Sequence, residues 1–141
     1  MDLKLICFFV SSHFEISEED LFKKTRKREI LIPRQIFHFL SRKHTKNTFK
    51  SIGVFSNGEH RKKIDHATVI HSVNDIQDKI DINDNFVVSS IKEIEKNIRK
   101  YMLSVHLIPV DVDLLRLAVK NTQRNHITTP NDNRGKKETV L

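Results

Sequence analysis

Apolar residues recur through most of the chain at spacings of three and four, which place their side chains on one face of an α-helix. The clearest run repeats at four, three and four on Val69, Val73, Ile76 and Ile80. The next run keeps this period over four turns on Val87, Ile91, Ile94, Ile98 and Met102. The pattern predicts two long amphipathic helices, with Asn83 or Asp84 as the cap of the second.

Four shorter helices are predicted in the first sixty residues. Apolar spacings of three and four over residues 3–14 indicate the first helix. Ser17 followed by three acids indicates the capped start of a short second helix. Pro33 is expected to begin a third helix over about 33–45, because proline favours the first turn. Thr48 is expected to cap the fourth.

The segment after the fourth helix is typical of a turn between two helices. Gly53 and Asn57-Gly58 are expected to end the fourth helix. At 100° per residue, a polar face lies opposite the apolar stripe of the following helix, and it consists of Ala67, His71, Asn74 and Asp78 with Thr68 beside them. The pattern predicts a helix-turn-helix over about 48–80, whose second helix can present its first turn to the major groove.

Beyond Tyr101 the helical period weakens. Extended structure is favoured at Val105, Leu107, Pro109 and Val110. We therefore expect a helical DNA-binding domain over 1–103 and an apolar extension over 104–120, which either packs on the core or binds a protein partner. Residues 121–141 are polar and are expected to be disordered.

A net charge of +7 and a pI near 9.6 favour a polyanionic partner such as nucleic acid or an acidic membrane. Five cations in the six residues from Lys23 to Arg28 form a run that self-repulsion keeps exposed. No membrane partner is expected, because the apolar run from Leu5 to Val10 is far shorter than the roughly 20 residues that span a bilayer. The single cysteine, Cys7, excludes an internal disulfide and fits a reducing, cytoplasmic location.

Four short motifs follow one another in the order of a known family and near its spacing. They are Ile16-Ser17-Glu18-Glu19-Asp20-Leu21, the basic run ending at Arg28, Ile32-Pro33-Arg34-Gln35 and Asp65-His66-Ala67-Thr68-Val69-Ile70-His71. Together they resemble the C-terminal DNA-binding domain of the bacterial replication initiator DnaA, in the Trp-repressor-like helix-turn-helix superfamily. The resemblance covers roughly residues 6–100. It implies an all-helical fold of about six helices that binds specific double-stranded DNA.

The resemblance implies a role for each matching residue. Asp65, His66, Ala67 and Thr68 would read bases in the major groove of an AT-rich nine-base DnaA box. A carboxylate there can accept from a cytosine amino group, and methyl groups can contact thymine methyls. Arg28 would enter the narrow minor groove beside the box. Arg42, Lys50 and His71 match positions that contact the backbone or help to dock the motif. Arg34 of the Pro-Arg-Gln element is a further DNA-binding candidate.

Two departures from the family precede the signature. Eleven residues, from Val54 to Ile64, separate Gly53 from Asp65, several more than in the family. Ile64 also stands where the family has arginine, and Lys62 and Lys63 are expected to supply the missing positive charge. We therefore expect a longer basic loop before the recognition helix.

No catalytic, nucleotide, cofactor or metal site is expected. The three glycines cannot form a phosphate-binding loop, so the ATP binding of a full initiator is not expected of this chain. His66 and His71 lie about 140° apart on a helix, an arrangement unsuited to a shared metal ion. Acids from Glu18 to Asp20 are ordinary in a first helical turn.

The resulting hypothesis is a non-catalytic reader of DnaA-box-like duplex sites, acting in replication initiation, its regulation, or transcription. A second hypothesis is the DNA-targeting fragment of a split enzyme, such as a replication ATPase or a transposase. A third is a protein-interaction bundle whose basic charge is incidental. Binding to AT-rich against random duplexes distinguishes the first from the third.

Overall fold

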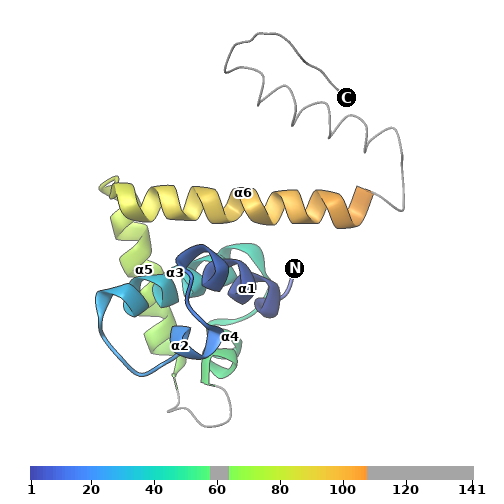
Figure 1. Ribbon diagram of the computed structural model, residues 1–141. Helices are drawn as coiled ribbons and strands as arrows, with labels where there is room; N and C mark the ends of the chain where they lie inside the picture. Colours follow the sequence, from blue (N-terminus) through green and yellow to red (C-terminus); the bar gives the residue numbers. More distant parts are fainter. Residues whose placement is uncertain (58–63, 108–141) are drawn as a thin grey trace. The chain divides into compact units, whose positions relative to one another are not determined.

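The computed structural model describes residues 1–57 and 64–107. These residues form six α-helices and contain no strand, which confirms the predicted all-helical class (Figure 1). The helices are α1 (Leu3–Phe14), α2 (Glu18–Leu21), α3 (Arg28–His44), α4 (Phe49–Asn57), α5 (His66–Asp81) and α6 (Asn85–Leu107). The predicted site residues Lys62 and Lys63 lie outside the described residues.

Capping side chains set the starts of five helices, and Asp65 of α5 is described below with the candidate interface. Ser17 Oγ accepts the backbone N–H of Asp20 at 3.0 Å, and Thr48 Oγ1 accepts that of Ser51 at 3.0 Å, as predicted. Asp84 Oδ1 accepts the Val87 N–H at 3.1 Å, so Asp84 is the cap before α6. Asp2 does the same for α1, through the N–H of Leu5.

Helix α3 runs through the middle of the helical core and contacts α1, α2, α4 and α5 (Figure 1). Phe37 and Leu40 on α3 are fully buried. The other helices bury their own apolar stripes, through Ile6, Val10, Leu21, Ile52, Val69, Ile76, Val87 and Ile94. Removal of this apolar surface from water is the main favourable term that holds α4 and α5 in place.

The third helix begins at Arg28, so the predicted start at Pro33 is wrong. Lys27 O accepts the N–H groups of Ile30 and Leu31 at 3.0 and 2.8 Å, and the helix is already formed when it reaches the proline. Proline cannot donate a backbone hydrogen bond, so Pro33 forgoes one bond of the helix. Burial of Pro33 and of its neighbour Ile32 offsets that loss.

Two further expectations are corrected. Gly53 does not break α4, which continues to Asn57; the glycine is instead buried inside the helix. Val105 and Leu107 are helical, not extended, since α6 continues to Leu107. The apolar spacing of three from Met102 to Val105 keeps the helical period, and it outweighs the β-propensity of valine.

The chain forms two units, Met1–Ile98 and Arg99–Leu141, and all the residues discussed below as a DNA interface belong to the first. The predicted boundaries at 103 and 120 remain predictions. Within the described part of the chain, no helix is both long and apolar enough to cross a membrane.

Candidate nucleic-acid interface

The start of α5 is capped, and Asp65 to Thr68 are exposed to solvent. Asp65 is the N-cap: its Oδ1 accepts the Thr68 N–H at 2.9 Å and the Thr68 hydroxyl at 3.1 Å. The Thr68 backbone hydrogen bond, followed by the Thr68 hydroxyl, lowers the pKa of Asp65 below its usual value. Because the hydroxyl proton of Thr68 is directed to Asp65, the methyl group and the lone pairs of the hydroxyl oxygen are left for other contacts.

Helix α5 has one face in the core and an opposite polar face toward solvent, as the sequence predicted. Val69, Ser72 and Ile76 are buried. The predicted outward residues are all exposed, and they are Ala67, Thr68, His71, Asn74 and Asp78. His71 follows Ala67 by four residues and Thr68 by three, so the structure brings these three candidates onto one surface of the helix.

Charge along α5 distinguishes its two ends. Its second half carries the exposed acids Asp75, Asp78 and Asp81, which repel a phosphate backbone. Beyond the Asp65 cap the first turn contains no acid, and the N-terminal end of the helix dipole carries a partial positive charge. The N-terminal half of α5 is therefore the end suited to approach DNA.

Helix α4 meets the start of α5 in a helix-turn-helix, where Gly53 allows a very close approach. A Cβ added to Gly53 would lie 2.6 Å from the carbonyl oxygen of Ile64, too close for any side chain. Asn57 Oδ1 also accepts the Ile64 N–H. Lys50, one of the predicted backbone contacts, is exposed in the first turn of α4. The absence of a side chain at Gly53 thus fixes how the two helices pack.

Two predicted DNA-binding arginines hold neighbouring chain segments. Arg34 donates to the carbonyls of Lys23 and Thr25 at 2.7 and 2.8 Å, and burial lowers its pKa. It therefore anchors the loop that carries the basic run. Arg42 donates to the Asn47 carbonyl at 3.1 Å, and its guanidinium lies 4.3 Å from the centre of the Phe49 ring. This second arginine supports the turn between α3 and α4.

Lys43, a cation in the last turn of α3, is paired with an acid of α6. Its Nζ lies 2.8 Å from Glu95 Oε2, and His44 Nε2 lies 2.6 Å from the same oxygen. Burial raises the pKa of Glu95, but hydrogen bonds from Lys43 and His44 outweigh burial, and the net shift is downward. The pair joins α3 to α6 and partly neutralises the Lys43 charge.

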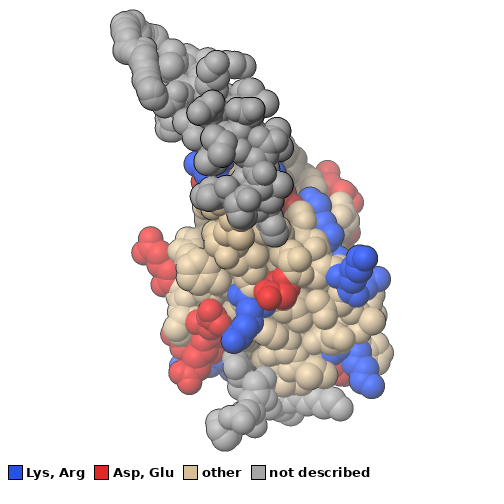
Figure 2. Space-filling model, turned by 90° about the vertical axis from the view of Figure 1, so that its right-hand side faces the viewer, with Lys and Arg blue, Asp and Glu red and all other residues tan. Residues whose placement is uncertain are grey.

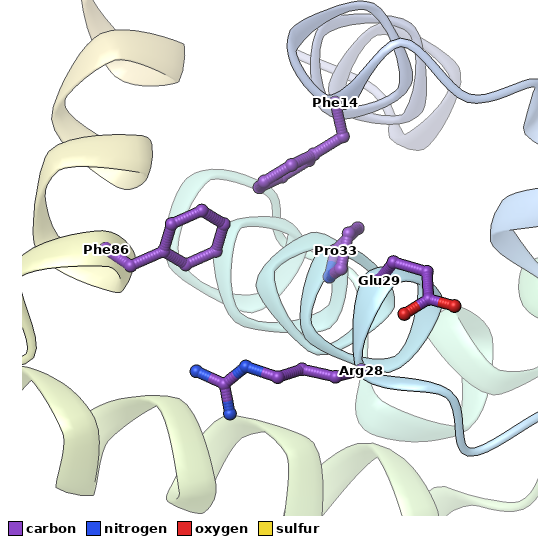
Figure 3. A pocket seen from close by; sticks show the side chains of 5 residues that line it. All are labelled: Phe14, Arg28, Glu29, Pro33 and Phe86. Carbon is purple, nitrogen blue, oxygen red and sulfur yellow. The ribbon is translucent and has the colours of Figure 1, made fainter.

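Arg28 lies at a pocket between α1, α3 and α6. The pocket has a volume of about 340 Å³ and is lined by Phe14, Arg28, Glu29, Pro33 and Phe86. Figure 3 shows the Arg28 side chain extending from α3 toward Phe86. The rings of Phe14 and Phe86 are 6.1 Å apart across this pocket. Arg28 thus lies beside an aromatic surface, and its entry into a minor groove remains a prediction.

The face drawn in Figure 2 carries no single basic patch. Lys and Arg side chains there are separated by acidic side chains and by wide uncharged surface. The net positive charge of the chain is therefore not gathered on this face, and local geometry at α5 identifies the interface better than total charge does.

His38 is a functional candidate that the sequence did not reveal. It is fully buried in α3, with Nδ1 2.9 Å from Ser72 Oγ of α5 and Nε2 3.2 Å from Ser56 Oγ of α4. Burial, with a smaller effect from the charge of Arg34, lowers the pKa of His38 to about 3. A histidine next to Phe37 and Phe39 offers no signal in sequence, because its partners lie far along the chain.

Comparison with known proteins agrees with this geometry. Residues 3–76 match the family described as bacterial dnaA protein helix-turn-helix. The chromosomal replication initiator protein DnaA of Desulfotalea psychrophila is 45% identical over 75 residues, which cover 53% of this chain and 14% of that protein. The DnaA of Chlorobaculum tepidum is 39% identical over 89 residues, which cover 63% of this chain and 17% of that protein.

A third relative matches a longer part of the chain. The DnaA of Bacteroides thetaiotaomicron is 30% identical over 98 residues, which cover 70% of this chain and 19% of that protein. The chain thus spans less than a fifth of each of these three relatives. With its six helices and its capped helix-turn-helix, the chain belongs to the bacterial DnaA helix-turn-helix family and is a DNA-binding domain of that family.

Proposed function

We propose that this domain reads sequence in double-stranded DNA at sites similar to the AT-rich DnaA box. The observation that carries the proposal is the first turn of α5, which is capped by Asp65, exposed, and free of further acids. A helix end of this kind is suited to the major groove, with its backbone N–H groups near phosphates and its side chains at base edges. The relatives are named chromosomal replication initiators, which favours a role in initiation or its regulation.

Four side chains, the Asp65 cap and the three that follow it, would carry base readout. The methyl groups of Ala67 and Thr68 suit thymine methyls, and His66 can donate to or accept from a base edge. The Asp65 carboxylate already accepts from Thr68, and it can accept one more donor such as a cytosine amino group. His71, one turn further along the same face, would contact the DNA backbone.

Cations outside α5 would position the domain without reading sequence. Lys50 would contact a phosphate, Lys62 and Lys63 would neutralise the backbone before α5, and Arg28 would enter the adjacent minor groove. With about five phosphate contacts, log affinity should fall by roughly 4 to 5 per decade of salt. One wrong base pair should cost roughly 1 to 3 kcal/mol.

Fluorescence anisotropy with labelled duplexes tests the proposal. A DnaA-box duplex, a scrambled duplex of the same composition and a random duplex are titrated over a salt series. Tighter binding to a subset of sequences at physiological salt supports the proposal, and a selection from a random duplex library then gives the cognate site. Equal, weak binding to all three duplexes that vanishes at physiological salt would refute sequence-specific reading.

A second candidate is DNA targeting for a separate catalytic partner, such as a replication ATPase or a transposase. The relatives support it, because the matched region is less than a fifth of each of them. The expected docking segment is residues 104–120. Co-purification of a catalytic partner that is lost when this segment is removed supports this candidate, and an intact chain that co-purifies with no catalytic partner contradicts it.

A further inference from the structure

The imidazole of His38 joins three helices of the first unit, α3, α4 and α5. His38 of α3 has no exposed surface and lies between Ser56 of α4 and Ser72 of α5. Its Nδ1 is 2.9 Å from Ser72 Oγ, and its Nε2 is 3.2 Å from Ser56 Oγ. Both serines are themselves buried. The arrangement links residues that are 34 and 18 positions away from the histidine.

The hydrogen bonds of Ser56 determine where the imidazole proton lies. Ser56 Oγ donates its single hydroxyl proton to the Ile52 carbonyl at 2.8 Å. It can therefore only accept from His38, so Nε2 carries the proton and donates. Nδ1 then has a lone pair and accepts from the Ser72 hydroxyl. The network is complete with a neutral imidazole in the Nε2–H tautomer.

Directional bonds at this point constrain α5 more than its apolar contacts do. Val69 and Ile76 bury methyl groups, and such contacts tolerate small rotations and slides of a helix. The bond to Ser72 requires one distance and one direction. Ser72 follows Thr68 by four residues on the same rigid helix, so any rotation there also turns the exposed reading turn.

We propose that His38 is a positioning residue for DNA readout: by bonding to Ser56 and Ser72, it sets the orientation of α5 relative to α4. This inference rests on the proposed function. In it, the exposed first turn of α5 contacts the bases, and buried His38 keeps that turn in the correct position. If His38 has this role, loss of its hydrogen bonds should reduce the preference of the domain for one DNA sequence over another. The affinity for the phosphate backbone should change less.

The test compares His38→Leu, which removes both bonds, with His38→Gln, whose amide can donate and accept in the same place. Ser72→Ala removes only the bond to α5. Ser41→Ala is the matched control, because the Ser41 hydroxyl is buried on the same helix without a hydrogen-bond partner among the described residues. Affinity for a selected duplex and for its scrambled version is measured well below each unfolding temperature, together with the salt slope.

We expect His38→Leu and Ser72→Ala to reduce the ratio of the two affinities by up to about tenfold, with an unchanged salt slope. His38→Gln should restore much of the ratio, and Ser41→Ala should leave it unchanged. If His38→Leu does not fold, Ser72→Ala decides. The inference is overturned if the wild type prefers the selected duplex and both Ser72→Ala and a folded His38→Leu keep the same affinity ratio. This outcome leaves the proposed function intact.

A wild type that does not discriminate at all refutes the proposed function, and the positioning role with it. The tautomer is tested without DNA, by the ¹⁵N chemical shifts of the His38 ring at neutral pH. A protonated Nε2 with an unprotonated Nδ1 supports the network. A protonated Nδ1, or a doubly protonated ring, overturns it.

Discussion

At the residue scale, the buried imidazole of His38 makes stability depend on pH. Its pKa is about 3 in the folded protein, chiefly because of burial, while an unfolded chain keeps the ordinary value of 6.5. Between pH 6.5 and 3 the unfolded state therefore binds more protons than the folded state, and stability falls as the pH falls through this window. Above pH 6.5 neither state protonates the ring, and this contribution disappears.

Because of His38, we expect the free energy of unfolding to be lower by about 2 kcal/mol at pH 5 than at pH 7.5. Urea unfolding at the two pH values measures the loss in the wild type and in His38→Gln. The glutamine variant lacks the titrating ring, so its loss should be smaller by about that amount. Identical losses in the two proteins would show that His38 titrates normally in the folded state.

Thr68 allows its methyl and hydroxyl groups to be tested separately. Thr68→Ser keeps the bond to Asp65 and removes the methyl, whereas Thr68→Val keeps a methyl and removes that bond. If the methyl reads a thymine, the serine variant should lose about 1 kcal/mol of discrimination at one base pair, and the valine variant should keep it. A duplex series with single substitutions measures this. The opposite order would assign the reading to the hydroxyl.

At the element scale, the contact between α4 and α5 depends on a glycine that the helix itself does not favour. Gly53→Ala should raise helix propensity by about 1 kcal/mol. The added Cβ, however, would lie 2.6 Å from the Ile64 carbonyl, so the backbone before α5 must move. We expect net destabilisation of about 1 to 2 kcal/mol, with weaker binding to specific DNA.

Urea unfolding of Gly53→Ala against Val54→Ala checks this expectation. Val54 is on the same helix and is 59% exposed, so its truncation should change stability by less than about 0.5 kcal/mol. A Gly53→Ala protein that is as stable as the wild type would show that α4 and α5 can separate without cost.

Helix starts were predictable where a local side chain sets them, and less so where tertiary packing does. Ser17 and Asp84 cap the helices that follow them, because an N-cap needs only a neighbour three residues away. The start of α3 at Arg28 was missed. Lys27 provides no side-chain cap, and the extra turn before Pro33 is held by buried Ile32.

At the scale of the whole molecule, a charge of +7 does not mean that every cation is available to DNA. Lys43 is bonded to Glu95, and Arg34 is bonded to two backbone carbonyls. Lys50 is exposed in α4, the first helix of the helix-turn-helix. The distribution of these contacts divides the cations into those that hold the fold and those that can meet a phosphate.

Lys50→Ala and Lys43→Ala form a matched pair that tests this division. Lys50→Ala should weaken binding to specific and scrambled duplexes alike and should reduce the salt slope by about 1. Lys43→Ala should leave the slope unchanged, because its ammonium is already paired with Glu95. Equal slopes for the two variants would contradict the assignment of Lys43 to the fold.

The sequence by itself determined the helical class, most caps, and the exposed polar face of α5. These features depend on interactions between residues three or four positions apart, and a periodic pattern records them directly. The order of the motifs around Pro33 and Asp65 also indicated the family, which the comparisons confirmed.

Only the tertiary structure decided what individual polar side chains do. The sequence indicated Arg34 as a DNA contact and Gly53 as a helix breaker, and it gave no signal for the roles of Lys43 and His38. Their partners are 11 residues away for Arg34, 34 for His38 and 52 for Lys43. Contacts at such separations follow from how helices pack on one another, which no local period encodes.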